Sequence, residues 1–286
     1  MTETSTRSAA ATAIYRGMDR AALDAAYNNS AAVVDSPDYL MRWRDRSALV
    51  RMRGNALLDL RYGVRPRAAL DFFSSGDTKA PLFVFIHGGY WQRNDKETFA
   101  FVAEGPMTHG IDVAVVGYTL APEARLSEIV AEIREALTYL DRRADELGFD
   151  REQIFIGGWS AGGHLTAAAA DHPSVCGGIA ISGIFDLEPI ALNYLNDNLK
   201  LSSHEIARLS PLRHVGAGLP PLSLFVGEAE LPELRWQSQA YAQAGRHGGA
   251  PIDLTVLPGH HHFSILEEWS RGGALTRELV RLSGTG

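Results

Sequence analysis

The sequence predicts one α/β domain, with a mostly parallel β-sheet flanked by helices and a helical extension at its N-terminus. Two patterns support this fold class: short apolar runs bounded by glycine and proline recur along the chain, and amphipathic helical segments lie between them. Continuous apolar runs are typical of strands buried on both faces, and their alternation with helices is typical of a parallel sheet. The 286 residues are 45% hydrophobic and 21% charged. Such a chain can bury a large core, which excludes a disordered or low-complexity protein.

The N-terminal part of the chain is predicted to be a tail followed by a helical extension. Residues 1–12 are polar and alanine-rich. They lack the basic start and the apolar stretch of a signal peptide, so we expect a disordered tail. Residues 13–55 are expected to form the helical extension, and residues 56–286 the main domain. The aromatic residues of the extension are expected to pack against that domain: Tyr27, Tyr39 and Trp43.

The main domain begins with a predicted antiparallel hairpin. Leu57–Tyr62 and Ala68–Phe73 are short strand candidates, and the Gly/Pro turn between them is typical of a hairpin at a sheet edge. Six apolar runs follow, each expected to be a strand with both faces buried. These runs are Pro81–Ile86, Ile111–Val116, Ile154–Ile156, Gly178–Ile181, Leu222–Val226 and Ile252–Leu257.

Helical patterns lie between these runs. The clearest has apolar residues at helical spacing on one face, and Gly148 is expected to end it. That face consists of Ile129, Ile133, Leu137, Leu140 and Ala144. Leu234–Ala244 is a second helix candidate, between the last two strands. Ligands of such sheets bind beyond the carboxyl ends of the strands, so functional residues are expected just after the apolar runs.

Charge and cysteine content limit the function classes. The chain has 27 Lys and Arg against 34 Asp and Glu, a net charge of −7, which argues against a nucleic-acid-binding protein. It has no apolar run of about 18 residues, so no membrane association is expected. The single cysteine, Cys176, cannot form an intrachain disulfide, which fits a reducing compartment, and we expect a cytoplasmic protein. The sequence leaves the oligomeric state open, with a homodimer as one candidate state.

Gly158–Gly162 contains the first candidate catalytic residue. It reads Gly-Trp-Ser-Ala-Gly, follows a predicted strand and precedes an alanine-rich helix. A serine hydroxyl is a poor nucleophile unless a tight turn exposes it and a base takes its proton. The pattern is typical of a nucleophile elbow with Ser160 at its apex. The alternative is a glycine-rich turn with an incidental serine, but the strand–turn–helix context favours catalysis.

His87–Trp91, which reads His-Gly-Gly-Tyr-Trp, ends an earlier predicted strand. Acyl transfer requires backbone amides that stabilise the oxyanion of a tetrahedral intermediate. The candidate donors are Gly88 and Gly89 in this segment and Ala161 directly after the candidate nucleophile. His87 is expected to brace the loop through hydrogen bonds. A plain Gly-Gly turn is the alternative.

Three consecutive histidines after the last predicted strand are candidates for the base. Hydrolases with this elbow order their catalytic residues as serine, acid and histidine along the chain. We favour His262, directly before Phe263, and His261 is the alternative. A metal site is disfavoured because adjacent rings do not easily converge on one ion, and no carboxylate or cysteine pattern accompanies them.

The carboxylates after the Leu222–Val226 run are candidates for the acid. Such a carboxylate orients the imidazole and stabilises its cation during the reaction. Glu230, three residues after Gly227, is favoured, and Glu228 is the alternative. Glu233 is expected to be a solvated residue at a helix start.

Together these segments resemble the kynurenine formamidase (arylformamidase) branch of the α/β-hydrolases. The resemblance runs from about Leu57 to the C-terminus and rests on the order and spacing of the motifs. The similar segments are His87–Trp91, Val116–Glu123 with Leu126 and Ile129, Gly158–Leu165, Ser182–Pro189, Asn193–Leu201, Ser210-Pro211, Pro232-Glu233, Gln237-Ser238 and His262–Ser264.

The resemblance implies the α/β-hydrolase fold and a serine hydrolase that cleaves a small amide or ester through an acyl-enzyme. An arylformamidase-like amidohydrolase is the expected function, and a general carboxylesterase for small acyl or aryl esters is the alternative. A non-catalytic ligand-binding scaffold is less favoured, because every part of the machinery is present. The implied roles are Ser160 as nucleophile, Glu230 as acid and His262 as base, with Gly88, Gly89 and Ala161 as oxyanion donors. No metal or organic cofactor is implied.

Aromatic residues next to these motifs favour an aromatic or apolar small-molecule substrate. Each could instead belong to the hydrophobic core. The candidates are Tyr90, Trp91, Trp159, Phe185 and Tyr194.

Overall fold

The computed structural model describes residues 12–285, and the chain within this range forms an eight-stranded sheet. The strands are β1 (Ala56–Arg61), β2 (Ala69–Phe73), β3 (Ala80–Ile86), β4 (Asp112–Val116), β5 (Phe149–Trp159), β6 (Val175–Ile181), β7 (Leu222–Gly227) and β8 (Ile252–Leu257). Their order is β1-β2-β4-β3-β5-β6-β7-β8. β2 pairs antiparallel with β1 and β4, and the other neighbouring strands are parallel. The predicted hairpin and mostly parallel sheet are confirmed, whereas the predicted tail lies outside the described residues apart from Thr12.

Helices connect these strands and precede β1. The α-helices are α1 (Arg20–Ala26), α2 (Asn29–Ala32), α3 (Ser36–Arg51), α4 (Glu104–Met107), α5 (Leu126–Leu147), α6 (Ala161–Ala169), α7 (Glu188–Ala191), α8 (Asn196–Leu199), α9 (Ser203–Leu209), α10 (Pro232–Gly248) and α11 (Ala274–Ser283). Short 3₁₀ helices are η1 (Lys96–Thr98), η2 (Ala100–Ala103), η3 (Pro211–Arg213) and η4 (Ser264–Trp269). As predicted, α5 ends at Gly148, whose φ of 89° is left-handed, and α10 includes the predicted second helix.

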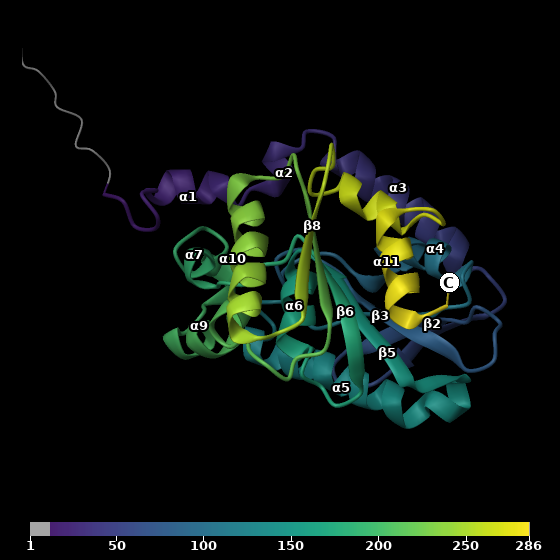
Figure 1. The fold of residues 1–286 in the computed structure, drawn as a ribbon. Coiled ribbons are helices and arrows are strands. Elements are labelled where there is room, and N and C mark those ends of the chain that lie inside the picture. The colour runs from purple at the N-terminus through teal and green to yellow at the C-terminus, as the bar shows by residue number, and fades with distance from the viewer. Residues whose placement is uncertain (1–11, 286) are drawn as a thin grey trace, which may run out of the picture.

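Side chains of β3 alternate between the two faces of the sheet, and helices cover each face. Leu82, Val84 and Ile86 belong to one hydrophobic core with residues of α5 and α6. Phe83 and Phe85 belong to another with residues of α3 and α11. Figure 1 shows α10 on one side of the sheet and α3, α4 and α11 on the other. Burial on both faces explains the continuous apolar runs of the central strands.

The last strand, β8, departs from the prediction. Both of its faces were expected to be buried, but only Ile252 is buried along the strand, and Val256 is 40% exposed. β8 lies at the end of the sheet and pairs with β7 alone. The prediction of two buried faces is therefore wrong for this strand, because the polar residues Asp253 and Thr255 alternate with its apolar residues and the strand lies at the sheet edge.

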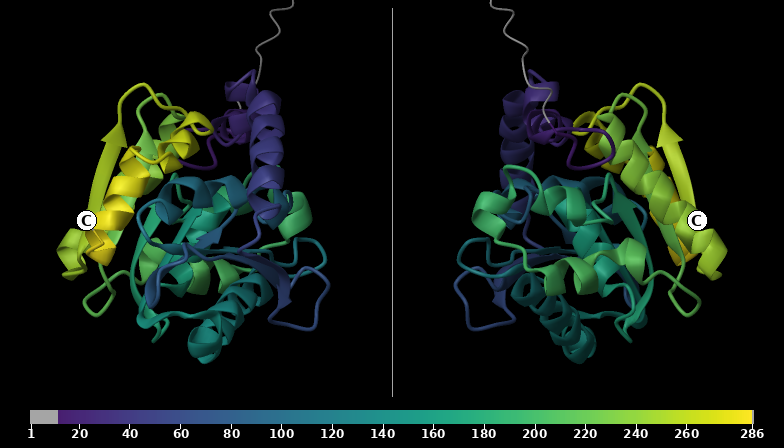
Figure 2. Two further views of the ribbon diagram at one scale, coloured as in Figure 1. Left: turned by 90° about the vertical axis from the view of Figure 1, so that its right-hand side faces the viewer. Right: turned by 90° about the vertical axis from the view of Figure 1, so that its left-hand side faces the viewer.

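The N-terminal helices pack against the main domain. Tyr27 and Trp43 are fully buried, as expected. The Trp43 ring stacks on Phe101 at a centroid distance of 5.3 Å, and its Nε1 donates a hydrogen bond to Glu267 Oε1 (2.7 Å). Figure 2 shows the purple N-terminal helices resting on the upper side of the domain in both views. They therefore share a core with the sheet.

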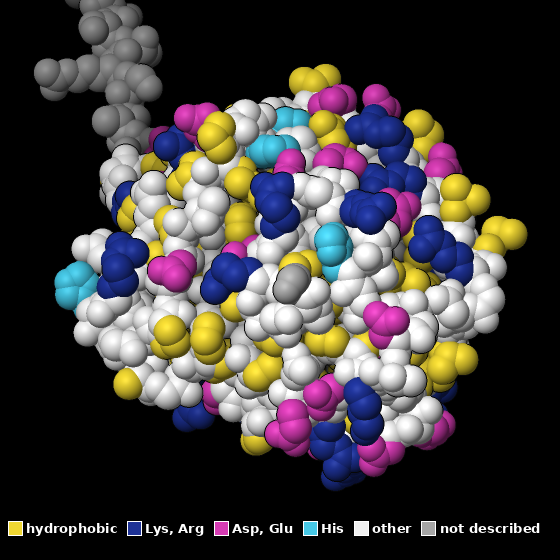
Figure 3. Space-filling view, turned by 45° about the vertical axis from the view of Figure 1, so that its right-hand side comes forward, with side chains coloured by type: hydrophobic (Ala, Val, Ile, Leu, Met, Phe, Trp, Pro, Cys, Tyr) yellow, Lys and Arg dark blue, Asp and Glu magenta, His cyan; other side chains and the backbone are white. Residues whose placement is uncertain are grey.

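The surface mixes both signs of charge. On the face drawn in Figure 3, basic and acidic side chains are interspersed, with hydrophobic side chains scattered among them. Within residues 12–285, no helix has both the length and the apolar character needed to cross a membrane.

Candidate active site

Ser160 lies in a strained turn between β5 and α6. Its φ of 59° and ψ of −116° fall in a region that residues with a Cβ rarely adopt. A Cβ at Gly158 would lie 2.4 Å from Gly162 O, and a Cβ at Gly162 would lie 2.0 Å from Ile86 O. Only glycine fits at these two positions. The tight turn holds the Ser160 side chain at the carboxyl end of β5.

Ser160, His262 and Glu230 form one chain of hydrogen bonds. The Ser160 hydroxyl donates to His262 Nε2 (3.1 Å), and His262 Nδ1 donates to Glu230 Oε2 (2.7 Å). Because a carboxylate accepts hydrogen bonds, the Nδ1 proton faces Glu230 and the lone pair of Nε2 faces Ser160. All three side chains are buried. This geometry suits removal of the serine proton as its oxygen attacks a carbonyl carbon.

Two donors hold the other oxygen of the Glu230 carboxylate. Ser182 Oγ donates to Oε1 at 2.5 Å, and the Gly227 amide donates to the same atom at 2.8 Å. Glu228, the alternative acid, is exposed and instead accepts a hydrogen bond from the Gly259 amide (3.3 Å). Ser182 was not among the predicted site residues. Its place directly after β6, at the carboxyl edge of the sheet, is the signal that could have identified it.

The three consecutive histidines have different partners. His260 Nε2 lies 3.2 Å from Glu268 Oε1. His261 Nδ1 accepts hydrogen bonds from two main-chain amides of its own loop, and burial lowers the pKa of this imidazole. His262 lies beside Ser160. The geometry therefore favours His262 over the alternative His261.

The glycine loop after β3 approaches Ser160 closely. A Cβ at Gly88 would lie 2.6 Å from the Trp159 ring and 3.0 Å from Ser160 Cβ, so a larger residue would not fit there. Gly89 has a φ of 116°, which favours glycine. Within residues 12–285, no acceptor takes the amide protons of Gly89 or Ala161. These amides are thus available to a ligand atom.

His87 is fully buried beneath this loop and stacks between the rings of Phe99 and Tyr118. Its Nδ1 lies 2.8 Å from Gly88 O and donates to it, while Tyr118 Oη donates to His87 O (3.0 Å). Burial lowers the pKa of His87 to about 4, so the ring is neutral near pH 7. These contacts fit the expected bracing role.

A cavity of about 100 Å³ lies beside Ser160 and His262. Three residues of the N-terminal segment, Asn29, Ser30 and Leu40, form part of its wall. Asn29 is held in place because its Nδ2 donates to Tyr90 Oη (3.0 Å). The helices α2 and α3 thus help to close the site, a contribution that no motif in the sequence indicates.

Two of the five aromatic candidates, Tyr90 and Trp159, line this cavity. Trp159 also holds His262 in place, since its Nε1 donates to the main-chain oxygen of His262 (2.8 Å). The structure does not bring Trp91, Phe185 or Tyr194 into the wall. Trp91 and Phe185 are fully buried in the hydrophobic core.

Glu233 departs from its predicted environment. It was expected to be solvated, but it is only 8% exposed at the start of α10. The N-terminal segment covers it, with Arg16 Nη1 at 3.4 Å from its Oε2. Burial raises the pKa of this carboxyl. The prediction is wrong because it did not anticipate packing of the extension onto α10.

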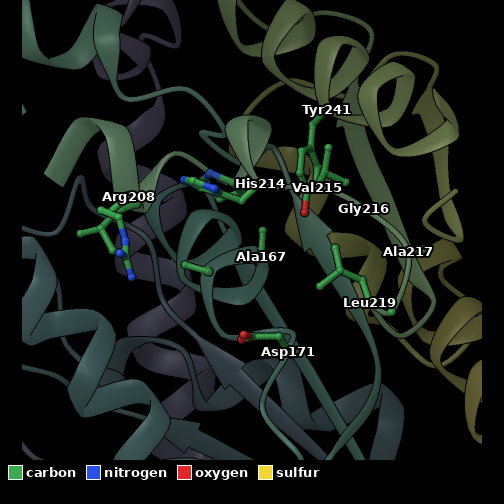
Figure 4. Close-up of a pocket in the computed structure, with 13 residues that line it drawn as sticks. Ala167, Asp171, Arg208, His214, Val215, Gly216, Ala217, Leu219 and Tyr241 are labelled. Atoms are coloured by element: carbon green, nitrogen blue, oxygen red, sulfur yellow. The ribbon is translucent and has the colours of Figure 1, made fainter. Parts of the chain in front are cut away.

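A larger cavity of about 590 Å³ lies near the opposite end of α6 (Figure 4). Its wall includes Ala167, Arg208, His214 and Tyr241. Ser160 lies before the first residue of α6, whereas Ala167 lies near its last. The larger cavity is therefore separate from the candidate active site.

Known proteins resemble the chain over most of its length. Family models match for the prolyl oligopeptidase family at residues 126–280 and for BD-FAE at residues 70–174. A kynurenine formamidase of Salmo salar is 31% identical, covering 82% of this chain and 85% of the relative. That of Danio rerio is 29% identical, covering 80% and 82%. A solved structure of a candidate thioesterase from Silicibacter sp. TM1040 has a TM-score of 0.82 at 31% identity, covering 90% of this chain and 98% of that one.

Proposed function

Since the chain belongs to the kynurenine formamidase family of the α/β-hydrolases, it is a serine hydrolase of the arylformamidase type, and we propose that it removes the formyl group from an N-formyl arylamine. The observation that carries the proposal is the Ser160–His262–Glu230 chain of hydrogen bonds beside a cavity of about 100 Å³. Sites that enclose a drug-sized ligand usually measure roughly 300–1,000 Å³. The smaller cavity here suits a small acyl group such as formyl.

In the first half of the proposed reaction, Ser160 Oγ attacks the formyl carbon while His262 Nε2 takes the hydroxyl proton. The carbonyl oxygen becomes an oxyanion that accepts hydrogen bonds from the amides of Gly89 and Ala161, with Gly88 as a further donor. The C–N bond then breaks, and His262 gives its proton to the leaving nitrogen. The products are a free arylamine and a formyl ester on Ser160.

In the second half, a water molecule attacks the formyl ester. His262 takes a proton from the water, and the same amides stabilise the second oxyanion. Breaking of the ester bond returns the proton to Ser160 Oγ and releases formate. Glu230 keeps the imidazole oriented and stabilises its cation in both halves. Ser182 and Gly227 serve this role indirectly by holding the carboxylate.

An aromatic leaving group is part of the proposal. The aromatic rings of Tyr90 and Trp159 in the cavity wall support it, because flat apolar surfaces favour contact with an arene. A carboxylesterase acting on small acyl or aryl esters is the alternative, since the same acyl-enzyme chemistry cleaves esters. The likeness to a candidate thioesterase supports keeping this alternative.

Two further features complete the proposal. We place the protein in the cytoplasm, supported by its single, free cysteine, Cys176. We also propose a homodimer, supported by exposed apolar side chains on α3, directly after it and on the edge strand β1, among them Met41, Leu49, Met52 and Leu57. Light scattering of the wild type and of Met52→Glu tests the dimer. A monomeric wild type would exclude it.

The catalytic proposal is tested by comparing kcat/KM on N-formylkynurenine, formanilide and p-nitrophenyl acetate. We expect turnover of both formamides, and its loss in Ser160→Ala and after treatment with a serine-directed phosphonate. Hydrolysis of the ester without hydrolysis of either formamide would replace the proposal by the carboxylesterase alternative.

A further inference from the structure

Within residues 12–285, Arg93 is the one permanently charged side chain in the wall of the cavity beside Ser160. Among the described residues that form this wall, none is Asp or Glu. Arg93 thus places a single positive charge at this cavity, although the whole chain carries a net charge of −7. Arg93 belongs to the glycine loop, since its main-chain amide donates to Gly89 O (3.0 Å). The turn that positions the proposed oxyanion donor thus also fixes the start of the Arg93 side chain.

The Arg93 guanidinium has no carboxylate of its own within residues 12–285. Other arginines of the described chain do have such partners: Arg46 lies 2.6 Å from both Glu104 and Glu267, and Arg213 lies 2.9 Å from Glu188. Arg93 is also exposed. Its five N–H groups are consequently free to bind an anion that enters with the substrate.

The Arg93 charge acts on two aromatic residues, Tyr90 and Tyr194. Burial is the largest effect on both phenols and raises the pKa of each, whereas the positive charge of Arg93 lowers both pKa values. Tyr90 lines the cavity together with Arg93. The guanidinium is therefore close to the ring that supports the aromatic leaving group in the proposed function.

We propose that Arg93 makes this hydrolase selective for substrates whose leaving group carries a carboxylate. The inference rests on the proposed function and narrows its substrate class to anionic arylamides. The small cavity takes the acyl group at Ser160, the arene lies against Tyr90, and its carboxylate binds Arg93. A guanidinium can donate two parallel hydrogen bonds to a carboxylate, which also fixes the orientation of the arene.

The test compares formanilide with the 2-, 3- and 4-formamidobenzoates, which differ from it by one carboxylate. The full chain is assayed as wild type, Arg93→Gln, Arg93→Lys and Arg208→Gln. Arg208 is the matched control, because it is an exposed arginine in the wall of the separate, larger cavity (Figure 4). The quantity measured is the ratio of kcat/KM for each formamidobenzoate to that for formanilide.

For the best isomer we expect a wild-type ratio of about 5 to 30, the range for a charge pair that remains partly hydrated. Arg93→Gln should reduce the ratio to about 1, Arg93→Lys should retain part of it, and Arg208→Gln should leave it unchanged. Added NaCl at about 0.5 M should reduce the wild-type ratio, because salt screens exposed charges. Equal ratios in the wild type and Arg93→Gln would overturn the inference, as would an equal decrease in Arg208→Gln.

A parallel pair of esters separates failure of this inference from failure of the proposed function. Phenyl acetate and 3-acetoxybenzoate differ by the same carboxylate. If no formamide is hydrolysed, the arylformamidase proposal fails. The ratio of kcat/KM for 3-acetoxybenzoate to that for phenyl acetate still tests whether Arg93 binds the carboxylate. If formamides are hydrolysed and no ratio depends on Arg93, only the inference fails.

Discussion

Ser160 combines burial, backbone strain and a hydrogen bond to His262 in a single residue. We predict that Ser160→Ala folds normally and loses about 10³–10⁶-fold in kcat/KM, because nucleophile and base act as a unit. Circular dichroism checks the fold, and a sensitive formate assay measures the remaining activity. Retention of a tenth of the wild-type rate would exclude Ser160 as the nucleophile.

The strain at Ser160 gives a second prediction at the residue scale. Alanine keeps the Cβ that is crowded at a φ of 59°, whereas glycine removes it. Ser160→Gly should therefore be more stable than Ser160→Ala by about 1 kcal/mol, with both variants inactive. Urea unfolding of the two proteins measures the difference. A less stable glycine variant would show that the turn is not strained in solution.

The choice of acid is also decided by single residues. Glu230→Gln should lower kcat by about 10²–10⁴-fold, because the amide can favour the wrong imidazole tautomer and cannot stabilise its cation. Glu228→Gln is the matched control, since Glu228 is exposed and bonded to Gly259. We expect the control to stay near wild-type activity. A larger loss of kcat in Glu228→Gln than in Glu230→Gln would assign the role of the acid to Glu228.

At the scale of elements, the sequence predicted the β5–α6 elbow well because its requirements are local. A strand, a tight turn and a helix leave a pattern of apolar residues and glycines within about fifteen positions. The cover formed by α2 and α3 could not be predicted in this way. Asn29 and Leu40 line the cavity only because the chain folds back over the sheet, and that long-range contact leaves no periodicity or motif.

Long-range contacts also explain why the predictions for three of the aromatic candidates and for the burial of β8 were wrong. Trp91 and Phe185 lie near the carboxyl ends of strands, as Tyr90 and Trp159 do, so sequence position alone did not separate core from cavity. In the Ile252–Leu257 run, Asp253 and Thr255 alternate with apolar residues and are exposed, and the strand lies at the edge of the sheet. Residue type predicts a preference for burial, whereas tertiary neighbours decide which residues are buried.

The attachment of α2 to the glycine loop gives a prediction for an element. Tyr90 Oη donates to Tyr27 O (2.6 Å) and accepts from Asn29 Nδ2, so Tyr90→Phe leaves both groups without this partner. We expect a loss of about 1–3 kcal/mol in the free energy of unfolding. We also expect KM to rise by about two- to tenfold, with kcat less affected, because the cavity wall loosens while Ser160 and its partners remain.

Tyr62→Phe provides the matched control for this variant. Its hydroxyl is also buried and donates to Gly117 O (2.6 Å), but Tyr62 does not line the cavity. It should therefore lose comparable stability without a rise in KM. An equal rise in KM in both variants would mean that stability, and not the position of α2, determines substrate binding.

At the scale of the whole molecule, two buried histidines link stability to pH. His87 braces the glycine loop, and His164 on α6 lies one turn after Ser160. Each ring donates one N–H to a main-chain oxygen, and its other nitrogen is buried without a partner among the described residues. A second proton would therefore be buried without an acceptor. Burial accordingly lowers the pKa of each ring to about 4.

These shifts predict acid destabilisation within a defined range of pH. Between about pH 6.5 and 4 the unfolded chain binds a proton at each histidine and the folded chain does not, so stability falls as the pH is lowered. For each histidine, we expect the free energy of unfolding to fall by about 1.4 kcal/mol per pH unit as the pH is lowered. Over the whole range, each histidine should account for a loss of up to about 3 kcal/mol. Below about pH 4 both states are protonated, and this contribution to the slope ends.

Urea unfolding between pH 7 and 4.5 tests this prediction, with His164→Gln compared with the wild type. The unfolding free energy of the variant should depend less steeply on pH than that of the wild type, because one of the two titrating histidines is absent. This difference in slope is expected whatever the stability of the variant at pH 7. His247→Gln, in the exposed last turn of α10, is the control for loss of a histidine from the surface. If the unfolding free energies of the wild type and His164→Gln changed in parallel with pH, the result would contradict a neutral, buried His164 ring.

Because the His87 and His164 rings support segments that flank Ser160, we expect loss of activity at low pH to accompany the loss of stability. Both losses should be reversed when the solution is neutralised.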